Sequence, residues 1–252
     1  MRKLAPYCGG CWLTNQQEYE KQAAGMLLDN TRYVENRGVG APGLTNRPPN
    51  QYWIFWPREA ASKNIANVGK YTSDSWDGAF NLTTSYRRDS DIPRTFGDAH
   101  SILKFVRHNK GKLVVSDDEH LENIRTRKNQ PGTKHTAWLV SNCENTGGAK
   151  ARWDYGQALI ASGLRLDGYG ECFNNTIATK PWSTKPEHPT LFNKYKFYLA
   201  FENSIHCKDY VSEKFWRNAI FSGSVPVVFG PHRDDVAALA PPHSFIHTDD
   251  FS

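Results

Sequence analysis

The 252-residue sequence has no apolar stretch long enough to span a membrane or to serve as a signal peptide. It also has no glycine-rich phosphate loop, so a bound phosphate must rely on side-chain charge and on the free N–H groups of a helix end. Cysteine is scarce and odd in number. Cys8 and Cys11 form a CxxC, but Cys143, Cys172 and Cys207 supply no second close pair. This spacing argues against a structural zinc site and leaves the disulfide connectivity open.

The charge is weakly basic. The chain has 31 Lys and Arg against 26 Asp and Glu, a formal charge of +5. These residues are scattered and interleaved rather than gathered in a stripe, which argues against nucleic acid as a partner. A sugar nucleotide is acidic enough to account for the bias. The aromatic content of 13%, with eight Trp, suits stacking on sugar rings and equally suits an ordinary core.

Two N-glycosylation sequons are present, Asn81-Leu82-Thr83 and Asn174-Asn175-Thr176. Each tripeptide also occurs by chance. Together with several cysteines, they favour an oxidising secretory compartment and predict Asn81 and Asn174 as glycosylation sites.

The most informative stretch, residues 195–231, predicts a strand, a loop, a helix and a second strand. Tyr195 to Phe201 has the apolar density of a strand, and Val225 to Phe229 is a buried β-branched run. Between them, apolar residues at one-and-four spacing predict a helix with Ser212 as its N-cap and Gly223 as its stop. Ligands of such βαβ units bind where strands end and helices begin. The polar residues at that point are Asn203, Tyr210, Glu213 and Lys214, which predict a nucleotide-diphosphate site.

The exact residues of this stretch are more informative than its apolar periodicity. FYLAFENS, DYVSEKFWRNA and GSVPVVFGP resemble the donor-binding motif of the α-1,3-fucosyltransferases of glycosyltransferase family 10. The resemblance implies GDP-fucose as the donor, with Asn203, Tyr210, Glu213 and Lys214 holding phosphate, ribose and fucose. Upstream, the order of strand, Ser-Asn, helix, strand and Tyr-Gly is similar to the family's, and it implies that Arg152 faces the diphosphate. A helical arginine outside this context would usually be a surface residue.

The first half of the chain resembles the same family. Tyr52 to Trp56 (YWIFW) predicts a central strand, and Glu59 follows it where the resemblance implies the general base. The family's usual Glu-Ser-Pro is here Glu59-Ala60-Ala61-Ser62. FNLT and SYRRDSD, within residues 80–91, are similar to the Lewis-type members. Residues 24–33 resemble the acceptor segment, where Arg32 implies transfer to a 3-hydroxyl, although the residue by itself favours a solvated surface arginine over an acceptor contact.

A metal site is the competing interpretation of Asp89-Ser90-Asp91. Two carboxylates at this spacing can bind Mn²⁺ beside a diphosphate in glycosyltransferases of the other common fold. The donor motif lies over a hundred residues downstream, however, and the resemblance implies that Arg and Lys offset the diphosphate charge. We therefore expect no metal ligands and no required cofactor, with Mn²⁺ at most stimulatory, and we expect Arg88 and Asp89 to form structural ion pairs.

The remaining pattern predicts a helix over Glu18 to Leu28, a helix and strand over residues 102–115, and a charged linker over 117–131. In the second half it predicts a strand at residues 137–140, a helix at 149–161 and a strand at 164–169.

The resemblance, over about residues 8–252, implies an α/β fold. We expect the GT-B arrangement of two Rossmann-like domains facing a cleft, truncated at both ends. Residues 1–125 would bind the acceptor, and residues 126–252 would bind GDP-fucose. The expected reaction is inverting transfer of fucose to the 3-hydroxyl of GlcNAc in a glycan of the N-acetyllactosamine or Lewis type. Core α-1,3-fucosylation of N-glycans, a different sugar nucleotide, and an inactive fragment that binds GDP or glycan remain alternatives; a lectin-like module fits least. The expected location is the Golgi lumen, on a type II anchor absent from this chain.

Overall fold

The computed structural model describes residues 2–3, 10–28, 47–57, 59–60, 78–98, 100–102, 128–175 and 191–251. They belong to two compact units. The first comprises Met1–Glu59, Asn64–Ser85 and Asp89–Pro93, and the second comprises Ala60–Lys63, Tyr86–Arg88 and Arg94–Ser252. The predicted domain boundary at residue 125 lies outside the described residues, as do the predicted helix, strand and linker over 102–131 except at their ends. Among the described helices, none is long and apolar enough to cross a membrane.

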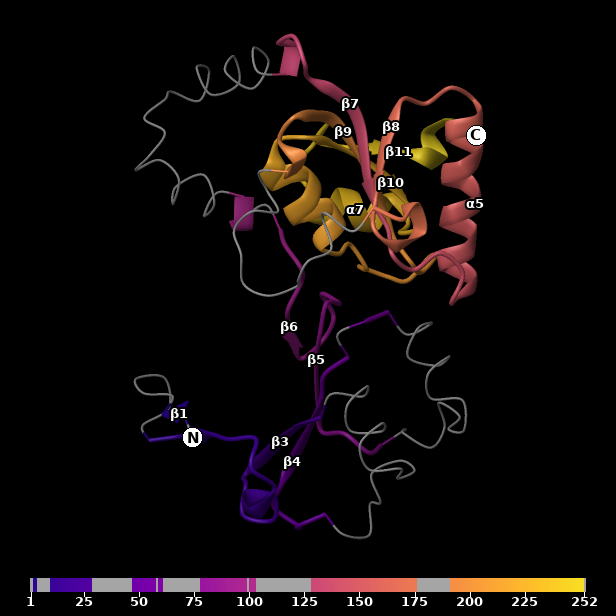
Figure 1. Cartoon of the computed structure of the whole chain (residues 1–252). Coiled ribbons are helices and arrows are strands. Elements are labelled where there is room, and N and C mark those ends of the chain that lie inside the picture. Colours follow the sequence, from indigo (N-terminus) through magenta and orange to yellow (C-terminus); the bar gives the residue numbers. More distant parts are fainter. Residues whose placement is uncertain are drawn as a thin grey trace, which may run out of the picture. The chain divides into compact units, whose positions relative to one another are not determined.

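The first unit contains a parallel four-stranded sheet in the order β3-β4-β5-β6 (Figure 1). Its strands are β3 (Gly25–Leu28), β4 (Tyr52–Phe55), β5 (Leu82–Ser85) and β6 (Ile92–Pro93). A small antiparallel pair, β1 (Arg2–Lys3) and β2 (Trp12–Leu13), is separate from this sheet. Since β4 lies between β3 and β5, the prediction of a central strand at residues 52–56 is confirmed.

The predicted helix over Glu18 to Leu28 is wrong. Only Gln17–Tyr19 forms a helical turn (η1, a 3-10 helix), and Gly25–Leu28 is strand β3. The amide of Gln51, just before β4, donates to the carbonyls of Glu20 and Ala23 at 2.6 and 2.9 Å. These bonds, and the pairing of β3 with β4, use backbone groups that a helix would need for itself. Tertiary contacts therefore decide between helix and strand for this short apolar run.

The second unit is built on a five-stranded parallel sheet in the order β11-β10-β9-β7-β8. The strands are β7 (Lys134–Leu139), β8 (Leu166–Tyr169), β9 (Tyr195–Phe201), β10 (Val225–Phe229) and β11 (Ile246–His247). The sequence predicted the first four of them. This strand order is that of a doubly wound α/β sheet, in which the chain leaves the middle of the sheet first on one side and then on the other.

Helices cover both faces of this sheet (Figure 1). Helix α5 (Gly147–Ala161) joins β7 to β8, a helical segment comprising η6 (Lys214–Ala219) and η7 (Ile220–Ser222) joins β9 to β10, and α7 (Arg233–Leu239) joins β10 to β11. Short 3-10 turns, η4 (Glu171–Phe173) and η8 (Thr248–Phe251), follow β8 and β11. Along β9, Leu199 and Phe201 pack with residues of α5, while Tyr198 and Ala200 pack with those of η6 and α7. Burial on both faces explains why β9 is a nearly unbroken apolar run.

The helix after β9 differs from the predicted α-helix. It is π-helical over Lys214–Ala219, and it begins after Glu213 with no side-chain cap. The expected cap, Ser212, does contact the first turn: its hydroxyl oxygen accepts from the backbone N–H of Lys214 at 3.5 Å and from Lys214 Nζ at 2.7 Å, and its carbonyl accepts from the N–H of Phe215 at 3.1 Å. Gly223, with φ of 72°, ends the helical segment as predicted. π-Helical turns are rare in proteins and occur often at functional sites.

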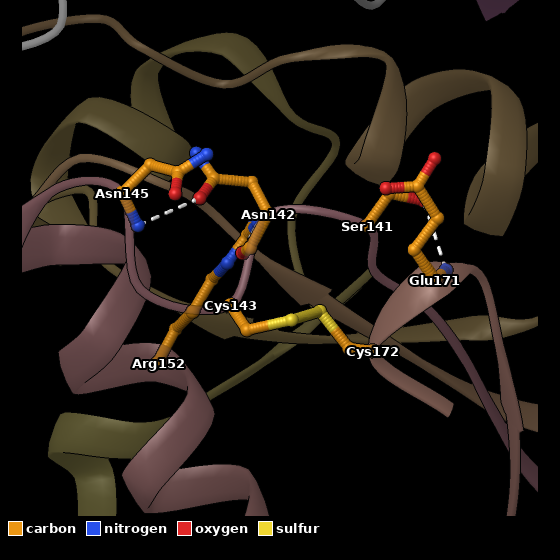
Figure 2. The surroundings of a disulfide bond; sticks show 7 residues. All are labelled: Ser141, Asn142, Cys143, Asn145, Arg152, Glu171 and Cys172. Atoms are coloured by element: carbon orange, nitrogen blue, oxygen red, sulfur yellow. Dashed lines mark hydrogen bonds between the residues drawn. A yellow bond between two sulfur atoms is a disulfide. The ribbon is translucent and has the colours of Figure 1, made fainter. Parts of the chain in front are cut away.

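One disulfide closes the β7–α5–β8 unit. Cys143, in the loop after β7, is bonded to Cys172 in η4, 29 residues later (Figure 2). Beside it the N–H of Glu171 donates to the hydroxyl of Ser141 at 3.3 Å. The loop after β7 is thus fixed to the turn after β8. Cys11 is also disulfide-bonded, which agrees with the expected oxidising compartment and with the argument against a zinc site at the CxxC.

Gly156 tests the packing of α5 on the sheet. A Cβ atom at this position would lie 2.3 Å from the ring of Trp138, a core residue with little room to move. Alanine normally stabilises a helix relative to glycine, but here we expect Gly156→Ala to lower the free energy of unfolding by about 1–3 kcal/mol, measured by denaturant titration. Gly147→Ala is the control, because its Cβ would meet nothing within 4 Å. Equal stability of the two variants would contradict this packing.

The disulfide should contribute substantially to stability. For a loop closed between positions 29 residues apart, chain entropy predicts that Cys143→Ala/Cys172→Ala loses about 3 to 4 kcal/mol of unfolding free energy. Chemical denaturation measures the loss, and reduction of the wild-type protein should cost at least as much, because it also breaks the disulfide of Cys11. Peptide mapping without reductant must first recover the linked pair. If the wild-type peptides are linked and the double variant still unfolds at the wild-type midpoint, this disulfide does not stabilise the protein.

Candidate functional site

The candidate site lies at the carboxyl ends of β7 and β9. These neighbouring strands are parallel, and the chain leaves them in opposite directions, from β7 to β8 and from β9 to β10. Open α/β sheets bind their ligands at such a switch point, where the loops after the two strands diverge. The residues after these strands include Asn142 and Asn203, and Arg152 comes from the helix between β7 and β8.

Arg152 joins the two strand ends. Its side chain is buried, and its Nη1 donates to the carbonyl of Phe201 at 2.9 Å. Its Nη2 donates to the carbonyl of Asn142 at 2.8 Å; Figure 2 shows Arg152 and Asn142. The Nε atom is buried with no hydrogen-bond partner among the described residues. Burial lowers the pKa of Arg152, while the nearby charges of Glu202, Tyr210 and Glu213 act in the opposite direction. Arg152 thus interacts electrostatically with Tyr210 and Glu213, two of the other predicted donor-binding residues.

Asn203 is held against the first turn of α5. Its carbonyl accepts a hydrogen bond from the hydroxyl of Thr146, the N-cap of α5, at 3.2 Å. A Cβ atom on Gly148 would lie 2.6 Å from that carbonyl, so only glycine permits this approach. Asn203 is only 8% exposed, and its side-chain oxygen is buried. Within the described parts of the chain, this oxygen accepts no hydrogen bond. Such an unsatisfied group is expected where a ligand completes the bonding.

Lys214 is the centre of a compact charged cluster. Its Nζ lies 2.9 Å from Glu202 Oε2, 2.7 Å from Ser212 Oγ and 3.3 Å from Glu213 Oε1. Burial by itself lowers the pKa of Lys214, but the carboxylates of Glu202 and Glu213 outweigh burial and raise it above the ordinary lysine value. Burial raises the pKa of Glu213, and the charge of Lys214 more than reverses that, so the pKa is lowered. Both groups are therefore ionised near neutral pH.

Tyr210 is buried in a second, aromatic part of the cluster. Its ring lies 5.0 Å from that of Tyr86 and 6.0 Å from that of Phe96, both in edge-on geometry. The preceding residue, Asp209, accepts hydrogen bonds from the backbone N–H and the Nε of Arg88 at 2.9 and 2.8 Å. The expected structural ion pair of Arg88 is confirmed. It fixes the loop that carries Tyr210.

Sequence reasoning missed Glu202 as a site residue. Its carboxylate is 1% exposed, accepts a hydrogen bond from the N–H of Ser212 at 2.8 Å and pairs with Lys214. The signal was present, because an ionisable residue follows the apolar strand β9 directly and such positions point to the ligand edge of the sheet. The sequence pattern by itself predicts only a loop after this strand.

The other predicted residues lie elsewhere. Glu59 is partly exposed, four positions beyond the end of β4, and belongs to the first unit. Arg32 lies outside the described residues. Asn81 and Asn174 are both exposed; the side-chain oxygen of Asn81 accepts a hydrogen bond from the N–H of Trp53 at 2.8 Å, and Asn174 has a positive φ of 51° after η4.

Asp91, the second carboxylate of the considered metal motif, belongs to the sheet of the first unit. Its Oδ2 accepts hydrogen bonds from the N–H and the hydroxyl of Thr83 at 2.8 and 2.9 Å. These two bonds lower the pKa of Asp91. In the part of the chain that the structure describes, no group of three or more His, Cys, Asp or Glu side chains could hold a metal ion.

Comparison with known proteins agrees with this geometry. The C-terminal fucosyltransferase domain of glycosyltransferase family 10 matches residues 129–252, and the fucosyltransferase N-terminal domain matches residues 3–97. The human 4-galactosyl-N-acetylglucosaminide 3-alpha-L-fucosyltransferase FUT5 is 34% identical over 249 residues, which are 99% of this chain and 57% of that protein. The cattle 3-galactosyl-N-acetylglucosaminide 4-alpha-L-fucosyltransferase FUT3 is 35% identical over 250 residues, 99% of this chain and 59% of that protein.

The chain thus spans slightly less than three fifths of the length of these curated relatives. The two family domains together account for both units, and the second contains the charged cluster at the ends of β7 and β9. The chain belongs to glycosyltransferase family 10, the fucosyltransferases.

Proposed function

We propose that the chain transfers fucose, with inversion, from GDP-fucose to the 3-hydroxyl of GlcNAc in a glycan. The observation that carries this proposal is the set of unsatisfied polar atoms at the β7–β9 switch point. Arg152 Nε can donate one hydrogen bond and Asn203 Oδ1 can accept, and both are buried without partners among the described residues. A sugar nucleotide offers phosphate oxygens to the first and hydroxyl groups to the second.

The charges of the cluster suit a diphosphate leaving group. As fucose departs, negative charge develops on the β-phosphate of GDP, and preorganised cations stabilise that charge most effectively where water is excluded. Arg152 is a buried cation, and Lys214, whose side chain is 14% exposed, is a largely buried one that begins the helical segment η6. In this proposal they offset the charge without a required metal ion, and Mn²⁺ is at most stimulatory. Asn203, Tyr210 and Glu213 position phosphate, ribose and fucose.

The acceptor side of the reaction needs a general base. The attacking hydroxyl must lose its proton on the face opposite the leaving group, and we assign this role to Glu59. We also propose the GT-B arrangement of two Rossmann-like domains, with Glu59 in the acceptor-binding first unit and Lys214 in the donor-binding second unit. Arg32 is the proposed acceptor contact and supports transfer to the 3-hydroxyl. The names of the relatives cover both 3-alpha and 4-alpha transfer at similar identity, so identity alone does not choose the linkage.

The proposed location is the Golgi lumen, with membrane attachment by a type II anchor. Exposed Asn81 and Asn174, proposed as glycan sites, and the disulfide between Cys143 and Cys172 are compatible with a secretory compartment.

One assay tests the proposal. The purified chain is incubated with GDP-fucose and either N-acetyllactosamine or an N-glycan core, in the presence of EDTA. Fucosylated N-acetyllactosamine is the expected product, with an α-1,3 linkage by NMR. Product only on the core would support core fucosylation, and a requirement for added metal would restore the Asp89 and Asp91 interpretation. GDP binding without turnover would indicate a member that only binds.

Loss of the Lys214 charge should weaken the binding of GDP. A charge-assisted hydrogen bond contributes about 1.5–3 kcal/mol, so we expect Lys214→Ala to raise the GDP dissociation constant about 10- to 100-fold in calorimetry. Lys150→Ala is the matched control, because Lys150 forms an exposed pair with Asp154 on α5 and should leave the constant unchanged. Equal weakening of acceptor and GDP binding would count against the diphosphate role.

Loss of the proposed base should act on chemistry rather than on donor binding. We expect Glu59→Gln to lower kcat about 10²- to 10⁴-fold, with the GDP dissociation constant nearly unchanged. Glu18→Gln, an exposed carboxylate of the same unit, is the control and should retain wild-type turnover. Near-normal turnover in Glu59→Gln would show that another group takes the proton.

A further inference from the structure

The carboxylate of Glu202 links two parts of the candidate site. It lies directly after β9, and its Oε1 accepts a hydrogen bond from the N–H of Ser212, ten residues later, at 2.8 Å. Its Oε2 lies 2.9 Å from the ammonium of Lys214, the first residue of η6. One buried side chain therefore holds both the end of the loop between β9 and η6 and the cation that begins η6.

The partners of the Lys214 ammonium differ in burial. An ammonium has three N–H groups, and three oxygens surround this one. Glu202 and Ser212 are buried and lie within 2.9 Å, whereas Glu213 lies 3.3 Å away and its side chain is 26% exposed. Glu213 is thus the partner that a phosphate oxygen can replace at least cost. When a phosphate oxygen replaces Glu213 beside the ammonium, the buried Glu202 remains as its carboxylate partner.

We propose that Glu202 is a positioning residue for the donor diphosphate. It holds the Lys214 ammonium at the carboxyl end of β9 and keeps it protonated, while Glu213 occupies the outer side until the diphosphate arrives. This inference rests on the proposed function of the site and adds a residue to it. Glu202 contacts no substrate in this proposal and acts through Lys214.

The surrounding charges explain why a carboxylate is needed at this position. Four groups act on Lys214: Glu202 after β9, Glu213 beside it in sequence, Arg152 of α5, and the phenol of Tyr198 in β9. Arg152 repels the ammonium, and burial disfavours its charge. Without Glu202, the partly exposed Glu213 alone would oppose these two effects. The pKa of Lys214 would then fall, because a buried amine without an inner carboxylate favours its neutral form.

The direction of the pH effect follows from this argument. In the wild-type protein the pKa of Lys214 is raised, so the charge is fully present below the ordinary lysine pKa and is lost only above it. GDP binding should therefore be insensitive to this lysine between about pH 6.5 and about pH 9. In Glu202→Gln the ammonium is lost within that range. Affinity should then decrease as the pH rises, by up to about tenfold per pH unit above the lowered pKa.

The experiment is calorimetry of GDP binding to the wild type and to Glu202→Gln at about pH 6.5 and about pH 9. Glutamine has the same shape and can still accept from the N–H of Ser212, so the variant removes charge with little change in volume. We expect the ratio of variant to wild-type dissociation constants to be at least about tenfold larger at the higher pH. Asp154→Asn, the same chemical change on an exposed carboxylate of α5, should give a ratio near one at both pH values.

The outcomes separate this inference from the proposed function. A wild type that does not bind GDP overturns the proposed function itself. A wild type that binds, with a Glu202→Gln variant of equal affinity or of pH-independent loss, overturns the inference alone.

Folding is checked with a second variant. If Glu202→Gln unfolds, the cause should be a largely buried ammonium left with only the partly exposed Glu213 as its carboxylate partner, and Glu202→Gln/Lys214→Met should recover the melting temperature because both inner charges are then removed. A double variant as unstable as the single one would contradict the proposal.

Discussion

Two backbone carbonyls at the ends of β7 and β9 share one guanidinium, and the candidate site depends on that shared contact. Arg152 donates to the carbonyls of Asn142 and Phe201. It comes from α5, which connects β7 to β8 and not to β9. A parallel sheet leaves the last carbonyls of its strands unpaired at one edge, so a buried donor is needed there. Arg152 donates to these two carbonyls through Nη1 and Nη2. Its Nε has no partner among the described residues and remains able to donate to a ligand.

Charge balance is the second constraint. Arg152 and Lys214 are offset by Glu202 and Glu213, so the ligand-free cluster has no net formal charge. A buried pair of cations without those carboxylates would be costly to fold. The arrangement balances the charges within the second unit itself, and the proposed diphosphate would replace the more exposed carboxylate, Glu213.

The sequence predicted the second unit well and the first less well, for a physical reason. Strands such as β9 are buried on both faces, so their apolar runs are long and unambiguous. Residues 18–28 are a short apolar run whose form depends on bonds from Gln51, which no local pattern contains. At the site, the resemblance predicted roles for Arg152, Asn203 and Lys214, whereas the contacts of Glu202 with residues ten and twelve positions later are seen only in the fold.

The disulfide also bears on the order in which the protein matures. Cys143 and Cys172 both lie within the β7–α5–β8 unit, and no later strand contributes to their pairing. During synthesis this unit emerges before β9, so oxidation can close it while the rest of the sheet is still absent. The closed unit then presents β7 as an open edge, onto which β9 and the following strands can add in sequence. An oxidising lumen would thereby act on the folding pathway as well as on the finished protein.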